Sequence, residues 1–146
     1  MIRNENGTSY TALNALIARA ANWPDTAVVL TDEQALSLHR RWNAALSTRL
    51  DYALEFHGDR PAREAVASAW LALRDDQQVL RSLIDAHGNR AATAAAADQE
   101  AAMVALAASI VGPAATPRLA AAAGRGYLAR VRSFSPGEGA EHARTA

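Results

Sequence analysis

Five side chains on three expected helices could form one interior site: His39, Trp42, Asp76, Gln77 and Glu100. The expectation comes from helix register, because two short glycine-containing turns would fold the three helices back on one another. His39 would then lie level with residues 76–78 of the next helix, and that segment level with Glu100. Such a layer would occupy the interior of a helical bundle, where ligand and metal sites are commonly built.

This layer would have several chemical uses. One imidazole and two carboxylates suit a divalent metal, and a buried His–Asp pair can act as a general base. A small ligand could instead be bound between the helices beside the tryptophan. The structural alternatives are a hydrogen-bonded network that fixes helix register, or partly exposed side chains that the assumed register misplaces. The sequence favours a structural role, because most polar groups at helix interfaces have one.

No motif with catalytic spacing occurs in the sequence. Glu-x-x-His, typical of carboxylate-bridged di-iron bundles, is absent, and so are His-Glu-x-x-His, the P-loop lysine motif, Gly-x-Gly-x-x-Gly and Gly-x-Ser-x-Gly. The chain has no cysteine and therefore no thiol nucleophile, thiolate ligand or disulfide. We expect no catalytic residue, no metal site and no cofactor.

Hydrophobic periodicity predicts about five helices. They are expected to cover roughly residues 8–21, 32–57, 61–87, 90–111 and 118–133. Thr31 and Gln34 form a capping-box pattern at the start of the second helix, and Gly58 and Gly88 follow the ends of the second and third. The predicted fold is all-α, a bundle built on a long antiparallel helical hairpin. Residues 1–134 are expected to form one domain, and 135–146 a disordered polar tail.

The composition excludes several classes of protein. Half of the residues are hydrophobic, but 37 are alanine and few are Val or Ile, which rules out an all-β fold. The net charge is zero, which argues against a nucleic-acid binder. We find no signal-peptide pattern and no run of 18 uncharged apolar residues, so no membrane association and a cytoplasmic location are expected.

The sequence thus predicts a non-enzymatic helical module that acts through protein contacts, self-association as a homodimer included. The alternative is a bundle that binds a small ligand near His39, Asp76 and Glu100. A seam of apolar residues on the third helix could serve either the intrachain core or a dimer: Val66, Trp70, Leu73, Leu80 and Ile84. The last helix carries only basic charges, which suits an acidic partner or an anionic membrane, but more commonly reflects the helix dipole.

Overall fold

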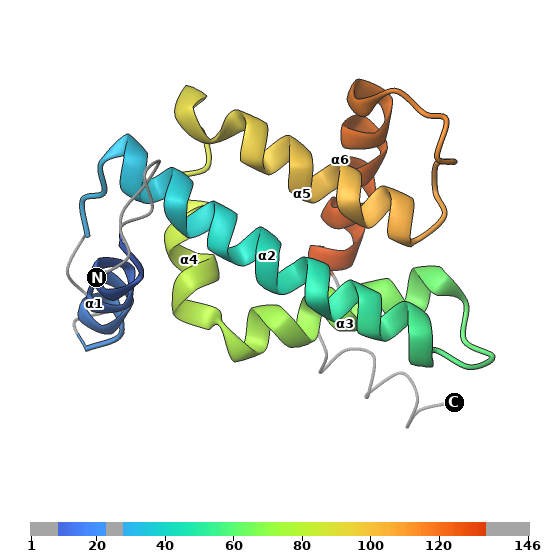
Figure 1. Ribbon diagram of the computed structural model, residues 1–146, viewed down its shortest axis with the longest axis horizontal. Coiled ribbons are helices and arrows are strands. Elements are labelled where there is room, and N and C mark those ends of the chain that lie inside the picture. The colour runs from blue at the N-terminus through green and yellow to red at the C-terminus, as the bar shows by residue number, and fades with distance from the viewer. Residues whose placement is uncertain (1–8, 23–27, 134–146) are drawn as a thin grey trace.

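The computed structural model describes residues 9–22 and 28–133, and within these ranges every regular element is helical (Figure 1). In chain order the elements are α1 (Tyr10–Asn22), α2 (Asp32–Phe56), α3 (Ala62–Asp76), α4 (Gln78–Ala86), the short 3-10 helix η1 (Ala91–Thr93), α5 (Ala94–Ala107) and α6 (Pro117–Ser133). The all-α fold class expected from the sequence is confirmed. The expected disordered tail, 135–146, lies outside the described residues.

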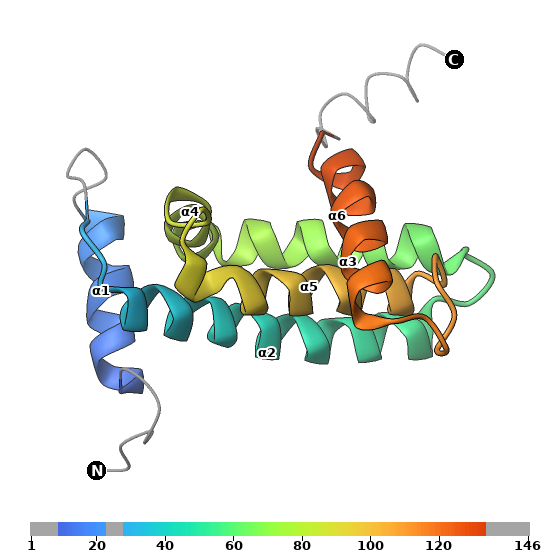
Figure 2. The ribbon, with the colours of Figure 1, turned by 90° about the horizontal axis from the view of Figure 1, so that it is seen from above.

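The longest helix, α2, begins at the predicted capping box. The Gln34 backbone N–H donates to Thr31 Oγ1 at 3.1 Å, and the Thr31 backbone N–H donates to Gln34 Oε1 at 2.9 Å. After α2 the chain turns through Gly58, whose φ of 59° is a left-handed conformation that glycine adopts without steric cost. Beyond this turn α3 runs back along α2, side by side with it in both ribbon views (Figures 1 and 2).

The helix expected over 61–87 is interrupted at Gln77, which was not predicted. Gln77 has φ −123° and ψ 45°, so the chain leaves the axis of α3 there and α4 begins in a new direction. A run of four polar residues at 75–78 has no apolar side chain to hold the helix against the core. The bend lets α4 bury Leu80, Leu83 and Ile84 against α1 and α2.

Helices α5 and α6 make the most extensive contact of any pair of elements. The expected helix 90–111 is shorter in the structure, because it starts as η1 and α5 ends at Ala107. In the view from above, α6 crosses α5 steeply (Figure 2). Gly124 lies against the Ala101 backbone, so close that an added Cβ would sit 1.7 Å from the Ala101 carbonyl oxygen. Glycine is therefore required at the crossing point.

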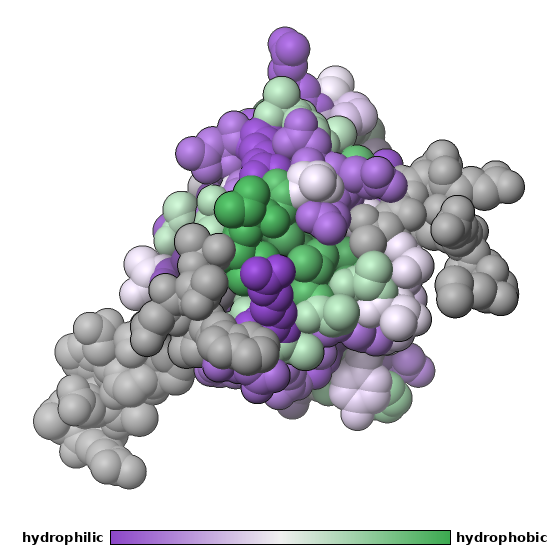
Figure 3. Space-filling view, turned by 90° about the vertical axis from the view of Figure 1, so that its left-hand side faces the viewer, coloured by the Kyte–Doolittle hydropathy of each residue, from purple (hydrophilic) through white to green (hydrophobic). Residues whose placement is uncertain are grey.

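The core lies between α2, α3, α4 and α5. Its largest fully buried side chains are Trp42, Trp70, Leu38, Leu46, Leu80, Val66 and Val104. The apolar seam of the expected third helix, left open between core and dimer by the sequence, is buried within the chain. Helix α1 packs at one end of the bundle, where hydrophobic side chains gather in the middle of the visible face (Figure 3). Among the described residues, no helix is long and apolar enough to span a membrane.

Candidate functional site

The Glu100 carboxylate lies at the centre of the bundle and contacts four other side chains. Its Oε2 accepts hydrogen bonds from Trp42 Nε1 at 2.8 Å, Trp70 Nε1 at 2.9 Å and Arg81 Nη1 at 2.7 Å. Its Oε1 lies 3.0 Å from His39 Nε2. We call these five residues the Glu100 cluster. One carboxylate thus joins side chains from α2, α3, α4 and α5.

Helix geometry explains how the cluster is assembled. His39 and Trp42 are three residues apart on α2, so both side chains project from the same face. The two indole rings meet edge to face, with centroids 5.6 Å apart and planes at 69°, an arrangement that aromatic pairs favour. The Arg81 guanidinium lies over both rings, at 4.8 Å from the Trp42 centroid and 5.3 Å from that of Trp70. The tryptophans therefore hold the arginine as well as the carboxylate.

The cluster is closed to solvent. His39 and Glu100 are each 3% exposed and Arg81 is 7% exposed. Burial alone raises the pKa of Glu100, but the hydrogen bond with His39, the charge of Arg81 and the Trp70 indole outweigh it and lower that pKa to about 2. Glu100 is therefore ionised at neutral pH and can only accept hydrogen bonds. It follows that His39 donates from Nε2.

A chain of charges links this buried carboxylate to the surface. Arg81 donates from Nε and Nη2 to Asp85 Oδ1, at 3.0 and 2.9 Å. Asp85 also accepts from Arg132 on α6, whose guanidinium lies over the Trp70 ring. Burial raises the pKa of Asp85, but the hydrogen bonds and charges of the two arginines lower it overall. The positive charge of Arg81 is thus shared between two carboxylates.

The structure brings together three of the five residues expected to form a site, namely His39, Trp42 and Glu100. Asp76 is not among them, since it is exposed and pairs with Arg49 on the outside of the bundle. Gln77 is exposed at the break between α3 and α4. The assumed register failed there because it treated 61–87 as one straight helix, whereas α4 takes a new direction after the break.

Sequence reasoning missed Arg81 and Trp70 as members of the cluster. Trp70 was interpreted as part of an apolar seam that serves either the core or a dimer, but a buried indole N–H needs an acceptor, and that requirement was a usable signal. Arg81 lies eleven residues after Trp70, which on a continuous helix would place both within about 20° of the same face. An arginine at such a position needs a buried anion, and Glu100 was already a candidate.

The geometry limits what the cluster can do chemically. Oε2 already accepts three donors and Oε1 faces the fourth, so the carboxylate has little capacity left for a ligand. The general base considered from the sequence needed an acidic partner at Asp76, which lies elsewhere. Within 9–22 and 28–133, no group of three or more His, Cys, Asp or Glu side chains could hold a metal ion. The cluster is arranged so that its hydrogen bonds and ion pair hold four helices together inside the bundle.

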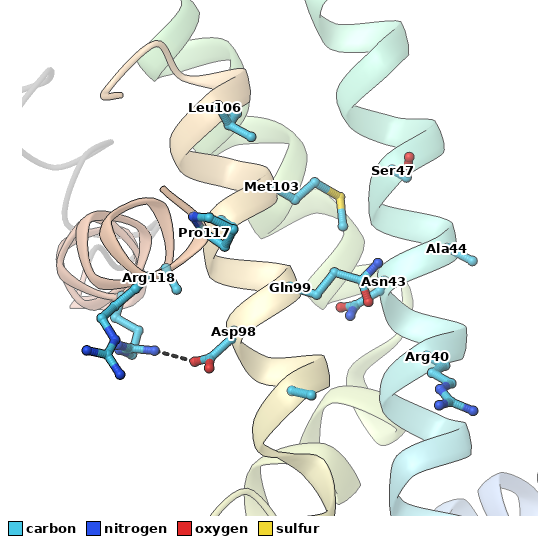
Figure 4. Close-up of a pocket in the computed structure, with 14 residues that line it drawn as sticks. Arg40, Asn43, Ala44, Ser47, Asp98, Gln99, Met103, Leu106, Pro117 and Arg118 are labelled. Atoms are coloured by element: carbon cyan, nitrogen blue, oxygen red, sulfur yellow. Dashed lines mark hydrogen bonds and ion pairs between the residues drawn. The ribbon is translucent and has the colours of Figure 1, made fainter. Parts of the chain in front are cut away.

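A large cleft lies on the surface between α2, α5 and α6 and has a volume of about 1180 Å³ (Figure 4). It is lined by Met103 and Leu106 together with exposed polar side chains, and Asn43 lies at its base. A smaller cleft of about 450 Å³ lies between α3 and α6 beside Tyr127. Neither cleft is lined by a member of the Glu100 cluster.

Comparisons of this chain with family models, with curated proteins and with solved structures find no match.

Proposed function

We propose that the chain is a non-enzymatic helical module that acts through protein contacts. These contacts include self-association as a homodimer. The observation that carries this proposal is an exposed aromatic pair on the last two turns of α2. Tyr52 and Phe56 are 67% and 63% exposed, and their rings pack on each other with centroids 4.6 Å apart. A paired, pre-positioned aromatic surface is typical of the anchors that dominate protein interfaces.

The interior of the bundle also supports this proposal, because the polar groups of the Glu100 cluster are used in contacts within the chain. Of the groups that first suggested chemistry, His39, Trp42 and Glu100 are hydrogen-bonded to one another and closed to solvent, whereas Asp76 and Gln77 lie on the surface. A rigid core of this kind holds exposed side chains in fixed positions, which reduces the entropy that binding costs. A cytoplasmic location is part of the proposal, and the cysteine-free composition is compatible with a reducing compartment.

The alternative, a small ligand held in the interior near His39, Asp76 and Glu100, has less support. Asp76 lies on the surface, and the oxygens of Glu100 are already occupied. The indole N–H groups of Trp42 and Trp70 and the guanidinium of Arg81 already donate to carboxylates of the chain. A ligand at this place would have to displace one of the buried hydrogen bonds.

Native mass spectrometry of the full chain, purified gently from its own host, tests the proposal. We expect a homodimer or a stoichiometric protein partner, which Tyr52→Ser combined with Phe56→Ser should abolish. Val29→Ser is the matched control, because Val29 is 86% exposed and precedes the opposite end of α2. A small, discrete mass adduct on a monomer would instead support the ligand-binding alternative. A bare monomer that both variants leave unchanged would contradict the proposal.

A further inference from the structure

We propose that the cleft between α2, α5 and α6 receives an acidic amphipathic helix of a partner protein. The inference rests on the proposed function, because it specifies where a partner binds and what chemistry that partner has. The cleft is distinct from the Tyr52–Phe56 pair, since neither aromatic residue lines it. The two surfaces can therefore be tested separately.

The shape of the cleft suits a helix. Helix α5 packs against both α2 and α6, whereas α2 and α6 do not contact each other within the described part of the chain. The outer face of α5 is therefore left as the floor between two walls (Figure 4). The floor runs from Ala95 to Leu106, a length of about 17 Å or three helical turns.

The side chains on the floor of the cleft also suit contact with a helix. Ala95 and Ala102 are small enough for another helix to approach closely, while Met103 and Leu106 supply apolar contact. Leu106 is 46% exposed and is one of the large hydrophobic side chains on the surface. The open volume is larger than that of most small-molecule pockets, which enclose about 300–1,000 Å³. An elongated partner with alternating small and apolar contacts fits this space better than a compact ligand.

The charges on the walls favour an acidic partner. Arg40 on α2 and Arg118 on α6 both line the cleft, and neither has an ion-pair partner among the residues that the structure describes. Arg125 lines it as well but is neutralised by Asp98. Pro117 and Arg118 belong to the first turn of α6, where the helix dipole adds positive potential. Each wall of the cleft thus carries one cationic side chain that can pair with a carboxylate of the partner.

The base of the cleft contains an unused hydrogen-bond acceptor. Asn43 is 4% exposed; its Nδ2 donates to the Ala96 carbonyl at 2.9 Å, but its Oδ1 has no partner in the described structure. Figure 4 shows the Asn43 side chain beside Gln99 in the space between α2 and α5. A buried acceptor without a donor is costly. Because this oxygen is closed to solvent, the Asn43 side chain has to turn towards the cleft, and a partner that then supplies a hydroxyl or amide donor would gain affinity there. The expected helix therefore carries Ser, Thr, Asn or Gln among its apolar positions.

Selection from a peptide library tests this inference. The full-length chain is used to select yeast-displayed helical peptides of about 12 residues, the length that spans the floor. We expect enriched peptides to combine an apolar stripe with Glu or Asp on its flanks and one hydroxyl or amide donor within the stripe. Amide chemical shifts of the labelled chain with the best peptide should change along α5 and the first turn of α6.

Matched variants locate the binding. Arg118→Glu should weaken binding of the selected peptide about tenfold or more, because it places like charges together. Arg19→Glu, the same charge change on the exposed face of α1, should leave it unchanged. Replacing the peptide's donor side chain with Ala should weaken binding to the native chain but not to Asn43→Leu. Thermal melts verify that each variant is folded.

The outcomes separate this inference from the proposed function. Peptides that bind equally to Arg118→Glu, or whose shifts map to Tyr52 and Phe56, would overturn the cleft as the docking site and leave the contact module standing. No enrichment would also overturn the cleft, and the module would then depend on the mass-spectrometry result. If no peptide is enriched and mass spectrometry shows a bare monomer, both the cleft as a docking site and the proposed function are overturned.

Discussion

Glu100 keeps its negative charge in an environment where burial alone favours the neutral acid. Four donors and one formal positive charge compensate the lost hydration, and three of these donors converge on a single oxygen. Charge-assisted hydrogen bonds of this kind are stronger than neutral ones. The consequence is that the free energy of unfolding depends on the ionisation of one residue.

We predict that this dependence is visible as acid sensitivity. The pKa of Glu100 is about 2 in the folded chain and near 4.5 without the fold. The carboxylate therefore stabilises the protein fully above pH 4.5, and this contribution is lost as the pH falls towards 2. Its size is about 3 kcal/mol. Urea unfolding of the native chain between pH 7 and pH 2 measures the loss.

Glu100→Gln should lower the free energy of unfolding at pH 7 by about 3 kcal/mol or more and flatten the stability profile between pH 4.5 and 2. Glu55→Gln on the exposed face of α2 is the control and should leave the profile as it is. Any remaining acid slope in Glu100→Gln is expected from Asp85, whose pKa is also lowered. An unchanged slope in Glu100→Gln would mean that Glu100 is not the residue that titrates.

Trp70→Phe tests a single donor of the cluster. The substitution keeps most of the ring but removes the N–H that donates to Glu100 Oε2 at 2.9 Å. We expect a loss of about 1–3 kcal/mol at pH 7, together with a rise of the Glu100 pKa that moves the acid transition to higher pH. Leu73→Met is a control for repacking, because Leu73 is 2% exposed in the same core without a polar contact. A loss of stability with no shift of the acid transition would assign Trp70 a packing role alone.

The sequence anticipated part of this cluster for physical reasons. His39 and Trp42 share a face of one uninterrupted helix, so their proximity follows from helix geometry. Glu100 was found by helix register, because the turn at Gly88 was expected to place it level with residues 76–78. The choice of Arg81 over Asp76 depends on the direction that α4 takes after Gln77, and no local pattern determines the angle of such a bend.

At the scale of elements, the contact between α5 and α6 depends on residues with very small side chains, alanine and glycine. Ala101, Ala105, Ala120 and Ala121 are all buried, and Gly124 permits backbone contact at the crossing. Such small side chains allow two helices to approach closely. Periodicity alone could not show which glycine was required, because Gly124 and Gly126 look equivalent along the chain.

Substituting the two glycines separately distinguishes them. Gly124→Ala would place Cβ 1.7 Å from the Ala101 carbonyl oxygen, so α6 has to move, and we expect destabilisation of about 1–3 kcal/mol or more. Gly126→Ala meets no atom within 4 Å and should stabilise the chain by about 1 kcal/mol through helix propensity. Thermal unfolding of both variants measures the difference. Effects of the same sign would show that the crossing is less close than described.

The helix start at Thr31 and the turn at Gly58 were predictable, because capping boxes and glycine turns are local signals. The break at Gln77 was not. It results from competition between a straight helix and burial of Leu80, Leu83 and Ile84 against α1, and that contact is distant in sequence. The break therefore reflects tertiary packing and not a local sequence signal.

At the scale of the whole molecule, the helices differ in how many polar contacts attach them to the rest of the bundle. The Glu100 cluster joins α2, α3, α4 and α5, and Arg132 extends the same charge network to α6. Helix α1 stands outside it. Leu13 is its one buried residue among those described, and its polar attachment to α2 is the bond from Arg41 to Asn14 at 2.7 Å with a weaker one to Tyr10. The molecule thus combines one tightly connected unit with one loosely attached helix.

Native-state hydrogen exchange should resolve these two levels, because local opening requires only the contacts of the opening segment to break. We predict that α1 amides exchange well before those of α2 and α5, which should exchange only with global unfolding. Glu100→Gln should then accelerate exchange in α2 and α5 while leaving α1 unchanged, and Asn14→Ala should do the reverse. If Glu100→Gln accelerates α1 by the same factor as α2, the two belong to one cooperative unit. The buried carboxylate would then stabilise the entire chain through contacts that α1 makes with α4.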